Sequence, residues 1–209
     1  SAGLNLRFDR FEVDIGGMVL GRPESPVQLR PEMRGALGGL RHDGLALPVV
    51  TERVGIDTHP IDPCSPDGTA TVRSFVWPDQ LDRLARTDAA ISVACQYPAE
   101  LIAATPGAQD DPTRGTATVL DALLQREGPA IVMHSIVWQY IPTEVRWRIT
   151  EVIESAGERA TSTEPLAWVR YEPDEWDRRR AAVWLRTFPD GADRLVAQVD
   201  YHGRWLAPA

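Results

Sequence analysis

The segment from Pro129 to Gly157 constrains the fold of this chain more than any other. Ala130–Met133 is a short apolar run of the kind that a strand makes when both of its faces are buried. After the polar pair His134-Ser135, apolar residues recur at helical spacing from Thr143 onward, namely Val145, Ile149, Val152 and Ile153. A buried strand followed by a helix predicts half of a βαβ unit. In such sheets, ligands bind at the carboxyl ends of the strands.

Composition limits the classes of function. The 209 residues, of which 43% are hydrophobic, are enough for one domain with a sizeable core. We find no apolar stretch near the roughly 20 residues that span a bilayer, so we expect no membrane partner. The net charge of -8 argues against a nucleic-acid partner. Every basic side chain is arginine, which excludes mechanisms that need a catalytic lysine. The spacing of Cys64 and Cys95 predicts two free thiols in a reducing cytoplasm.

Apolar patterns along the rest of the chain predict a series of strands and helices. Ser1–Leu6 has the character of a small-residue turn that opens a helix. Residues 8–31 alternate around Gly16-Gly17 and predict a small β-ribbon inserted in the domain. The other expected strands are residues 48–56, 101–104, 166–171, 181–188 and 194–201. Residues 71–77 are expected to extend the strand at 48–56 or to pair with it. The expected helices are residues 80–97, 116–126 and 143–157.

The alternation of strands and helices predicts the fold class. We expect a three-layer α/β domain with a doubly wound, mostly parallel sheet and a C-terminal antiparallel hairpin around Pro189–Asp193. No strand precedes the turn at Ala2-Gly3, so the first strand of the sheet is expected to be missing. Residues 1–209 would then be a single domain from the C-terminal part of a longer protein. An N-terminal segment or a second copy of the chain would complete the sheet.

Five segments together resemble one bacterial family, the domain-of-unknown-function family 2332. They are Ser1–Asp9, Gly55–Asp57 with Pro60 and Asp62, Trp77–Gln80, His134–Tyr140 and Asp200–Trp205. The resemblance spans nearly the whole chain. The family has no assigned activity, and its members are longer at the N-terminus, with a helical region and a strand that enters the Ser-Ala-Gly turn.

The order of the elements is also similar to that of S-adenosylmethionine-dependent methyltransferases. This similarity implies a Rossmann-like fold, S-adenosylmethionine as the cofactor and methyl transfer to an unknown small molecule. The chain departs from that pattern at two places. Thr105-Pro106 stands where an acidic residue that contacts adenine is expected, and the missing first strand would lie at the centre of the sheet.

The methyltransferase similarity assigns roles to individual residues. Ala2, Gly3 and Asn5 would form the turn that approaches the cofactor, and Asp57 would accept hydrogen bonds from its ribose hydroxyls. His134 would face the transferred methyl group and act as a base. We expect Ala2, Gly3, Asp57 and His134 to converge on one rim. The walls of the acceptor pocket would come from Trp138, Tyr140, Trp77 and His202.

Two other classes of function remain open. One is a non-catalytic binder of a nucleotide or metabolite with the same fold. The other is a metal-assisted hydrolase that uses Asp57, His59, Asp62 and His134, since imidazole and carboxylate are suitable metal ligands. The methyltransferase interpretation itself assigns no metal site. A purely structural role is the alternative for each residue whatever the class: Asp57 would simply cap backbone N–H groups, and His134 would be a core histidine bonded to a carbonyl.

Overall fold

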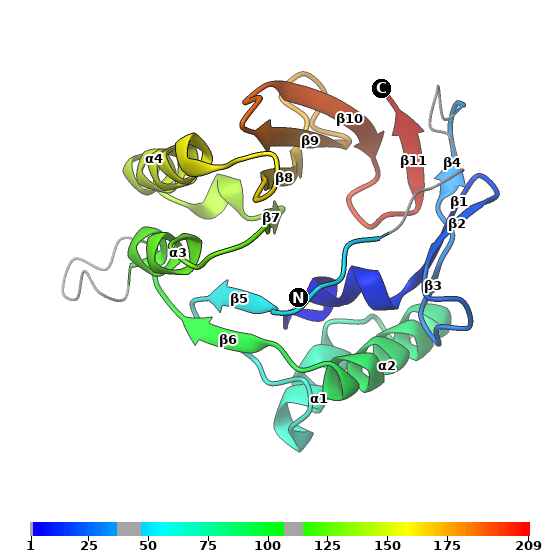
Figure 1. Ribbon diagram of the computed structural model, residues 1–209. Helices are drawn as coiled ribbons and strands as arrows, with labels where there is room; N and C mark the ends of the chain where they lie inside the picture. The colour runs from blue at the N-terminus through cyan, green and yellow to red at the C-terminus, as the bar shows by residue number, and fades with distance from the viewer. Residues whose placement is uncertain (1, 37–46, 107–114) are drawn as a thin grey trace. The chain divides into compact units, whose positions relative to one another are not determined.

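The computed structural model of the protein describes residues 2–36, 47–106 and 115–209 (Figure 1). The chain divides into two compact units. The first unit holds Ser1–Pro31 and Gly39–Ala103, and the second holds Glu32–Gly38 and Ala104–Ala209. Each unit contains buried apolar clusters of its own, so each has a hydrophobic core.

The first unit begins with a 3₁₀ helix and a small sheet. The helix is η1 (Leu4–Arg10). It is followed by β1 (Glu12–Ile15), which pairs antiparallel with β2 (Met18–Gly21) and parallel with β3 (Gln28–Leu29). The pairing of β1 with β2 agrees with the predicted alternation, although residues 8–10 belong to the helix and not to the strand.

A second, parallel pair of strands completes the first unit. β5 (Val54–Asp57) pairs with β6 (Glu100–Ala103), and α1 (Pro66–Ser74) and α2 (Leu81–Gln96) lie in the connection between them. Parallel neighbours need a crossover of this length. The helices pack through two apolar clusters, one of Phe11, Val27, Ala90 and Val93 and the other of Ala2, Val72 and Ile91.

The helix α1 forms where the apolar pattern of residues 71–77 predicts a strand, so that prediction is wrong. Ser65 caps the helix, because its Oγ accepts a hydrogen bond from the N–H of Gly68 at 3.0 Å. Pro66 occupies the first helical position, where its fixed φ is favourable. Val72 then lies on the buried side of the helix, against Ile91 of α2.

Cys64 and Cys95 form a disulfide bond, so the expectation of two free thiols is also wrong. Their Cα atoms lie 5.6 Å apart, within the usual range for a disulfide. They are separated by 31 positions in the sequence, and α1 and most of α2 lie between them. The spacing alone could not reveal the bond, because it depends on how the two helices pack together.

The second unit is built on a six-stranded sheet with the order β4-β11-β10-β9-β8-β7 (Figure 1). The pairs β7–β8 and β11–β4 are parallel, and the other three neighbouring pairs are antiparallel. The strands are β4 (Glu32–Met33), β7 (Ala130–Ser135), β8 (Leu166–Pro173), β9 (Ala181–Phe188), β10 (Asp193–Val199) and β11 (Trp205–Pro208).

Two helices pack in the second unit. α3 (Thr116–Leu124) contacts α4 (Thr143–Arg159), and α4 covers part of the sheet. Of the four residues predicted for the apolar face of α4, Val145, Ile149 and Ile153 are buried in the core cluster, whereas Val152 is only half-buried and lies outside it. The other members of the cluster are Ile141, Ala156, Leu166, Trp168 and Phe188. Among the described residues, no helix has both the length and the apolar character that crossing a membrane requires.

Helix α4 continues past Gly157, where the sequence predicts its end. A Cβ atom on Gly157 would lie 2.2 Å from a ring carbon of Phe188 in β9. The glycine is therefore a point of close packing between the helix and the sheet, and not a helix terminator.

The arrangement of the sheets contradicts the expected fold class. The protein is a mixed α/β protein with one six-stranded mixed sheet and two smaller sheets, not a three-layer, mostly parallel Rossmann-like domain. The connections give the physical reason. Residues 174–180, 189–192 and 200–204 join consecutive strands from β8 to β11, and segments this short do not allow the crossover that parallel pairing requires. The predicted C-terminal hairpin does form, from β9 and β10.

Candidate functional site

His134 and Glu172 form a hydrogen-bonded pair at the carboxyl ends of the parallel strands β7 and β8. His134 lies opposite Arg170 in the register, so Glu172, two residues further along β8, is its diagonal neighbour on the same face. The His134 Nδ1 atom lies 2.7 Å from Glu172 Oε1. The two side chains are 12% and 14% exposed. A buried contact of this length fixes the orientation of the imidazole ring.

Glu172 also holds the backbone that follows β7. Its carboxylate accepts hydrogen bonds from the N–H groups of Val137 at 3.2 Å and Trp138 at 3.3 Å. An ionised carboxylate only accepts, so the proton between the two side chains belongs on Nδ1 of His134. In the neutral imidazole, Nε2 then carries the lone pair that can accept a proton from a ligand.

Two tryptophans enclose the imidazole. Trp138, in the 3₁₀ turn η3 (Trp138–Tyr140), stacks on His134 with the ring centroids 4.6 Å apart and the planes 14° from parallel. Trp168 of β8 lies 6.0 Å from both rings. Within the described part of the chain, His134 Nε2 and Trp168 Nε1 are buried without a hydrogen-bond partner. An unpaired buried polar atom costs about 1–3 kcal/mol, so each of these two atoms needs a partner, either an ordered water or a ligand.

Backbone strain accompanies this cluster. Ile136, directly after β7, has a φ of 49°, a value that is rare for a β-branched residue. Its N–H donates to the Tyr171 carbonyl at 2.8 Å, which holds the strained residue against β8. This conformation turns the chain so that the next two N–H groups point at Glu172. Strain of this kind persists where the surroundings enforce it, and it is concentrated at functional sites.

The predicted cofactor turn lies in the first unit. Ala2 and Gly3 have φ values of 48° and 66°, and Gly3 precedes η1, which contains Asn5. A Cβ atom on Gly3 would lie 3.1 Å from the Leu101 side chain, so space is tight there. The carbonyl of Gly3 accepts a hydrogen bond from Nη1 of the buried Arg7. Burial, together with the neighbouring Arg53 charge, lowers the pKa of Arg7.

Asp57, the predicted ribose acceptor, is exposed as the last residue of β5. Its Oδ1 atom accepts a hydrogen bond from the N–H of His59 at 2.9 Å and lies 3.5 Å from Thr58 Oγ1. This is the backbone-capping arrangement expected if Asp57 has a purely structural role. Trp77, the predicted pocket residue of the same unit, follows α1 and is 72% exposed.

The remaining predicted pocket residues belong to the second unit. Trp138 is the one that contacts His134, and Tyr140, two residues later in η3, is 75% exposed. His202 is exposed in the turn between β10 and β11, where its backbone N–H donates to Asp200 at 2.9 Å. The structure thus brings His134 and Trp138 together. The expectation that Ala2, Gly3, Asp57 and His134 share one rim stays a prediction.

No metal centre is found in the described residues, because they contain no group of three or more histidine, cysteine, aspartate or glutamate side chains that could hold an ion. Two of the side chains proposed as ligands are used locally. Asp57 caps the N–H of His59, and Asp62 accepts a hydrogen bond from the N–H of Cys64 at 2.9 Å. The metal-assisted hydrolase therefore has no support in this geometry.

A shallow cavity of about 180 Å³ lies at the opposite ends of the same strands. Its walls include Ala130 and Leu166, the first residues of β7 and β8, and the ends of α3 and α4. None of the residues that surround His134 lines it. Ligands of α/β proteins bind at the carboxyl ends of strands, so we place the candidate site at His134 and not at this cavity.

Comparison with protein families matches residues 1–207 to the family described as "Uncharacterized protein conserved in bacteria (DUF2332)". The chain belongs to this family. Comparisons with the curated proteins and with the solved structures gave no match. The family that the sequence motifs indicate is therefore confirmed, whereas the similarity to methyltransferases receives no support from the comparisons.

Two residues of the site are absent from the motifs that carried the resemblance to family 2332. Glu172 and Trp168 both lie on β8, outside the His134–Tyr140 segment. Glu172 could have been found from sequence, because it ends the strand expected to follow the helix after His134, and the ends of parallel neighbours meet at one edge. Trp168 gives no such signal, since a tryptophan within an apolar strand is an ordinary core residue.

Proposed function

We propose that this protein is an enzyme that acts on a small molecule, with His134 as the base that removes a proton from the substrate. The observation that carries the proposal is the partly buried hydrogen bond between His134 and Glu172, made at the end of parallel strands where ligands bind. The bond sets the tautomer, and Nε2, which is buried and has no partner among the described residues, is the nitrogen that would take the proton.

The pair divides the chemical work between two residues. His134 Nε2 would take the proton. Glu172 is a positioning residue: it orients the ring and stabilises the imidazolium that forms when the proton arrives. A positioned general base typically contributes a factor of about 10²–10⁴ to the rate. Trp138 and Trp168 would keep water away from the reacting atoms, since both contact the ring.

For the reaction itself we propose methyl transfer from S-adenosylmethionine to a small acceptor. Asp57 fits a ribose, because it is an exposed carboxylate at the end of a strand in a parallel pair. Ala2 and Gly3 form a left-handed turn directly before η1, where Asn5 lies, and a turn of this kind lets backbone come close to a ligand. When bound, the cofactor would supply the electrophilic methyl group, and His134 would deprotonate the acceptor. We propose the cytoplasm as the compartment for this chemistry.

The test combines binding with turnover, and it uses the full-length gene product. Isothermal titration calorimetry with S-adenosylmethionine measures affinity, and transfer of a radiolabelled methyl group to pooled phenols, carboxylic acids and amines measures turnover. Heat of binding followed by transfer supports the proposal. The absence of both heat and a thermal shift would remove methyl transfer, and binding without transfer to any pool would favour the non-catalytic alternative.

Glu172→Gln separates positioning from packing, because the amide keeps the shape of the carboxylate but not its charge. We expect kcat to fall at least about tenfold while KM stays within about twofold, since the imidazolium that forms during proton transfer loses its anionic neighbour. Glu151→Gln, an exposed change on α4, is the matched control and should leave both unchanged. An unaltered kcat in Glu172→Gln would show that Glu172 only packs.

A further inference from the structure

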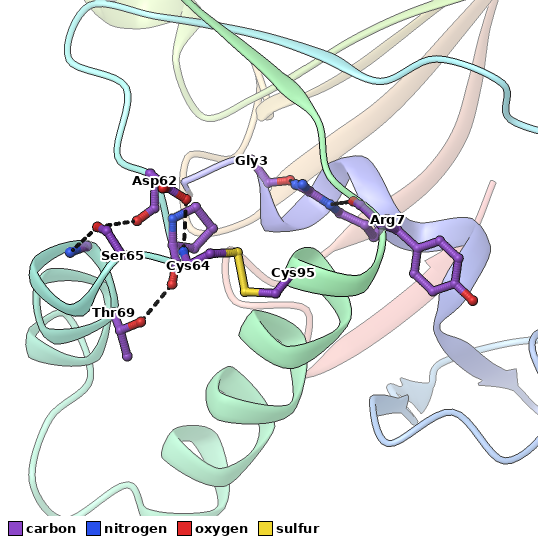
Figure 2. The surroundings of a disulfide bond; sticks show 10 residues. Gly3, Arg7, Asp62, Cys64, Ser65, Thr69 and Cys95 are labelled. Carbon is purple, nitrogen blue, oxygen red and sulfur yellow. Dashed lines mark hydrogen bonds between the residues drawn. A yellow bond between two sulfur atoms is a disulfide. The ribbon is translucent and has the colours of Figure 1, made fainter.

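The disulfide between Cys64 and Cys95 joins a loop to the end of a helix. Cys64 lies in the loop between β5 and α1, and Cys95 lies in the last turn of α2 (Figure 2). Both cysteines are exposed to solvent. A bond in this position is accessible to another thiol without any opening of the protein.

The core of the first unit does not contain this bond. Its buried clusters use apolar side chains of η1, α1 and α2, and neither cysteine belongs to them. In α2, Val93 and Ala94 are buried, but the chain is exposed again at Cys95. The packing of α1 on α2 therefore has its own apolar support, through Val72 and Ile91, and can persist when the bond is open.

Hydrogen bonds hold the start of α1 independently of the sulfur atoms. Asp62 accepts from the N–H of Cys64 at 2.9 Å, and Ser65 Oγ donates to the Asp62 carbonyl at 3.0 Å. Thr69 Oγ1 donates to the Pro63 carbonyl at 2.7 Å, as Figure 2 shows. The turn at residues 62–69 is therefore fixed to its own helix. What the disulfide adds is a tether from this turn to α2.

We propose that Cys64–Cys95 is a site of reversible thiol–disulfide exchange with a dithiol reductant of the thioredoxin class, and that reduction releases the loop of residues 58–65 from α2. One reductant thiolate attacks a sulfur of the bond and forms a mixed disulfide. The second reductant thiolate then resolves it. Two electrons and two protons pass to this protein, which ends with two thiols, while the reductant ends as a disulfide.

The class of partner follows from the position of the bond. Exposed disulfides are the labile and regulatory ones, whereas structural disulfides are shielded and resist reduction. In a cytoplasm, disulfides are usually transient and involved in sensing or catalysis. The inference does not depend on the chemistry proposed for His134, because the bond and that site belong to different units.

The test uses the wild-type protein in its native state. Thioredoxin, with thioredoxin reductase and NADPH, is added without denaturant, and thiols are then trapped with iodoacetamide and counted by intact mass. We expect two adducts within minutes, and none without thioredoxin. Bond survival until denaturant is added would overturn the proposal, as would the finding of free thiols in protein purified without reductant.

Hydrogen exchange measures the release of the loop. We expect amides of residues 58–61 to exchange about tenfold faster after reduction, with those of residues 62–65, β7 and β8 unchanged, because opening is local and hydrogen bonds still hold the turn at residues 62–69. The double variant Cys64→Ser with Cys95→Ser should show the fast-exchanging loop without reductant and no response to it. Equal exchange of the loop in the oxidised and reduced wild type would refute the release.

Discussion

The surroundings of His134 and of Asp57 differ in how they hold their functional groups, although both lie at the carboxyl end of a strand in a parallel pair. His134 is largely shielded from solvent, paired with Glu172 and stacked on Trp138. Asp57 is exposed and is bonded to the backbone of the residues that follow it. The hydrogen bond to Glu172 determines which nitrogen of His134 carries the proton. An exposed carboxylate such as that of Asp57 can instead bind a ligand from solvent. The contrast is between a group held in one orientation and a group accessible to solvent.

The largest effect that this contrast predicts is on turnover in His134→Gln. We expect kcat to fall by about 10²–10⁴-fold, because the base is lost, while the Kd for S-adenosylmethionine stays within about twofold. Radiolabel transfer and calorimetry measure the two quantities. Unchanged turnover would clear His134 of any catalytic part, and a parallel loss of affinity would break the contrast between the two groups.

The next effect concerns the first unit. Opening the bond through the double change Cys64→Ser and Cys95→Ser should lower the free energy of unfolding by roughly 3–4 kcal/mol, because the unfolded chain is no longer cross-linked across 31 positions. Urea unfolding measures the loss. Wild-type protein in excess reductant is the control and should give the same value. A loss of less than 1 kcal/mol in the free energy of unfolding would mean that the unfolded chain is already compact between residues 64 and 95 without the bond.

A smaller effect is expected at the helix–sheet contact of the second unit. Gly157→Ala should destabilise the protein by about 1–3 kcal/mol, because the new Cβ atom clashes with the Phe188 ring. Helix propensity alone predicts the opposite sign, a gain of up to about 1 kcal/mol. Ser155→Ala, an exposed change in the same helix, is the control and should stay within about 0.5 kcal/mol. A gain in stability in Gly157→Ala would show that β9 moves to make room for the new Cβ atom.

Tyr171 gives a pH dependence of stability. Burial, with the nearby Asp200 charge, raises the pKa of its hydroxyl to about 12, and that hydroxyl donates to the Asp200 carbonyl. The folded state keeps the proton longer than the unfolded chain, whose pKa is about 10. Stability is therefore full below about pH 10 and falls between about pH 10 and 12, by roughly 1 kcal/mol after screening. In Tyr171→Phe, denaturant unfolding should show no such fall in the free energy of unfolding between about pH 10 and 12. A fall that persists in this variant would come from another titrating group.

The smallest effect is expected at Asp57. Asp57→Asn should change the free energy of unfolding by less than about 0.5 kcal/mol, since the side chain is exposed and the amide oxygen still accepts from His59. The Kd for S-adenosylmethionine should rise, because a charged acceptor is lost. A stability loss above 1 kcal/mol would make Asp57 a structural residue and remove the contrast with His134.

The sequence predicts the local elements of this protein better than their assembly. The strand at residues 130–133, the helix from Thr143 and the hairpin after β8 all form, because each depends on neighbouring residues. The direction of strand pairing depends instead on the length of the connections. Residues 174–180 are too few for a crossover, and the run of apolar strands does not reveal this unless the connections are measured.

Prediction of the site shows the same limit. His134 was accessible from sequence as a polar residue at the end of a buried strand. Its partner Glu172 lies 38 positions away and is identified only by the register between β7 and β8. The disulfide is similar, since Cys64 meets Cys95 only after α1 has packed on α2. Contacts that depend on tertiary packing cannot be predicted from the residues alone.

The short strand β4 ties the second unit to an early part of the chain. Its two residues, Glu32 and Met33, pair with Trp205 and Leu206 of β11, whereas every other strand of that sheet comes from residues after 103. During synthesis, β4 leaves the ribosome long before its partner exists, so this edge can close only late. A shortened gene product that stops after β10 would leave β4 without a partner on that edge, and the two units therefore cannot be separated by a single cut.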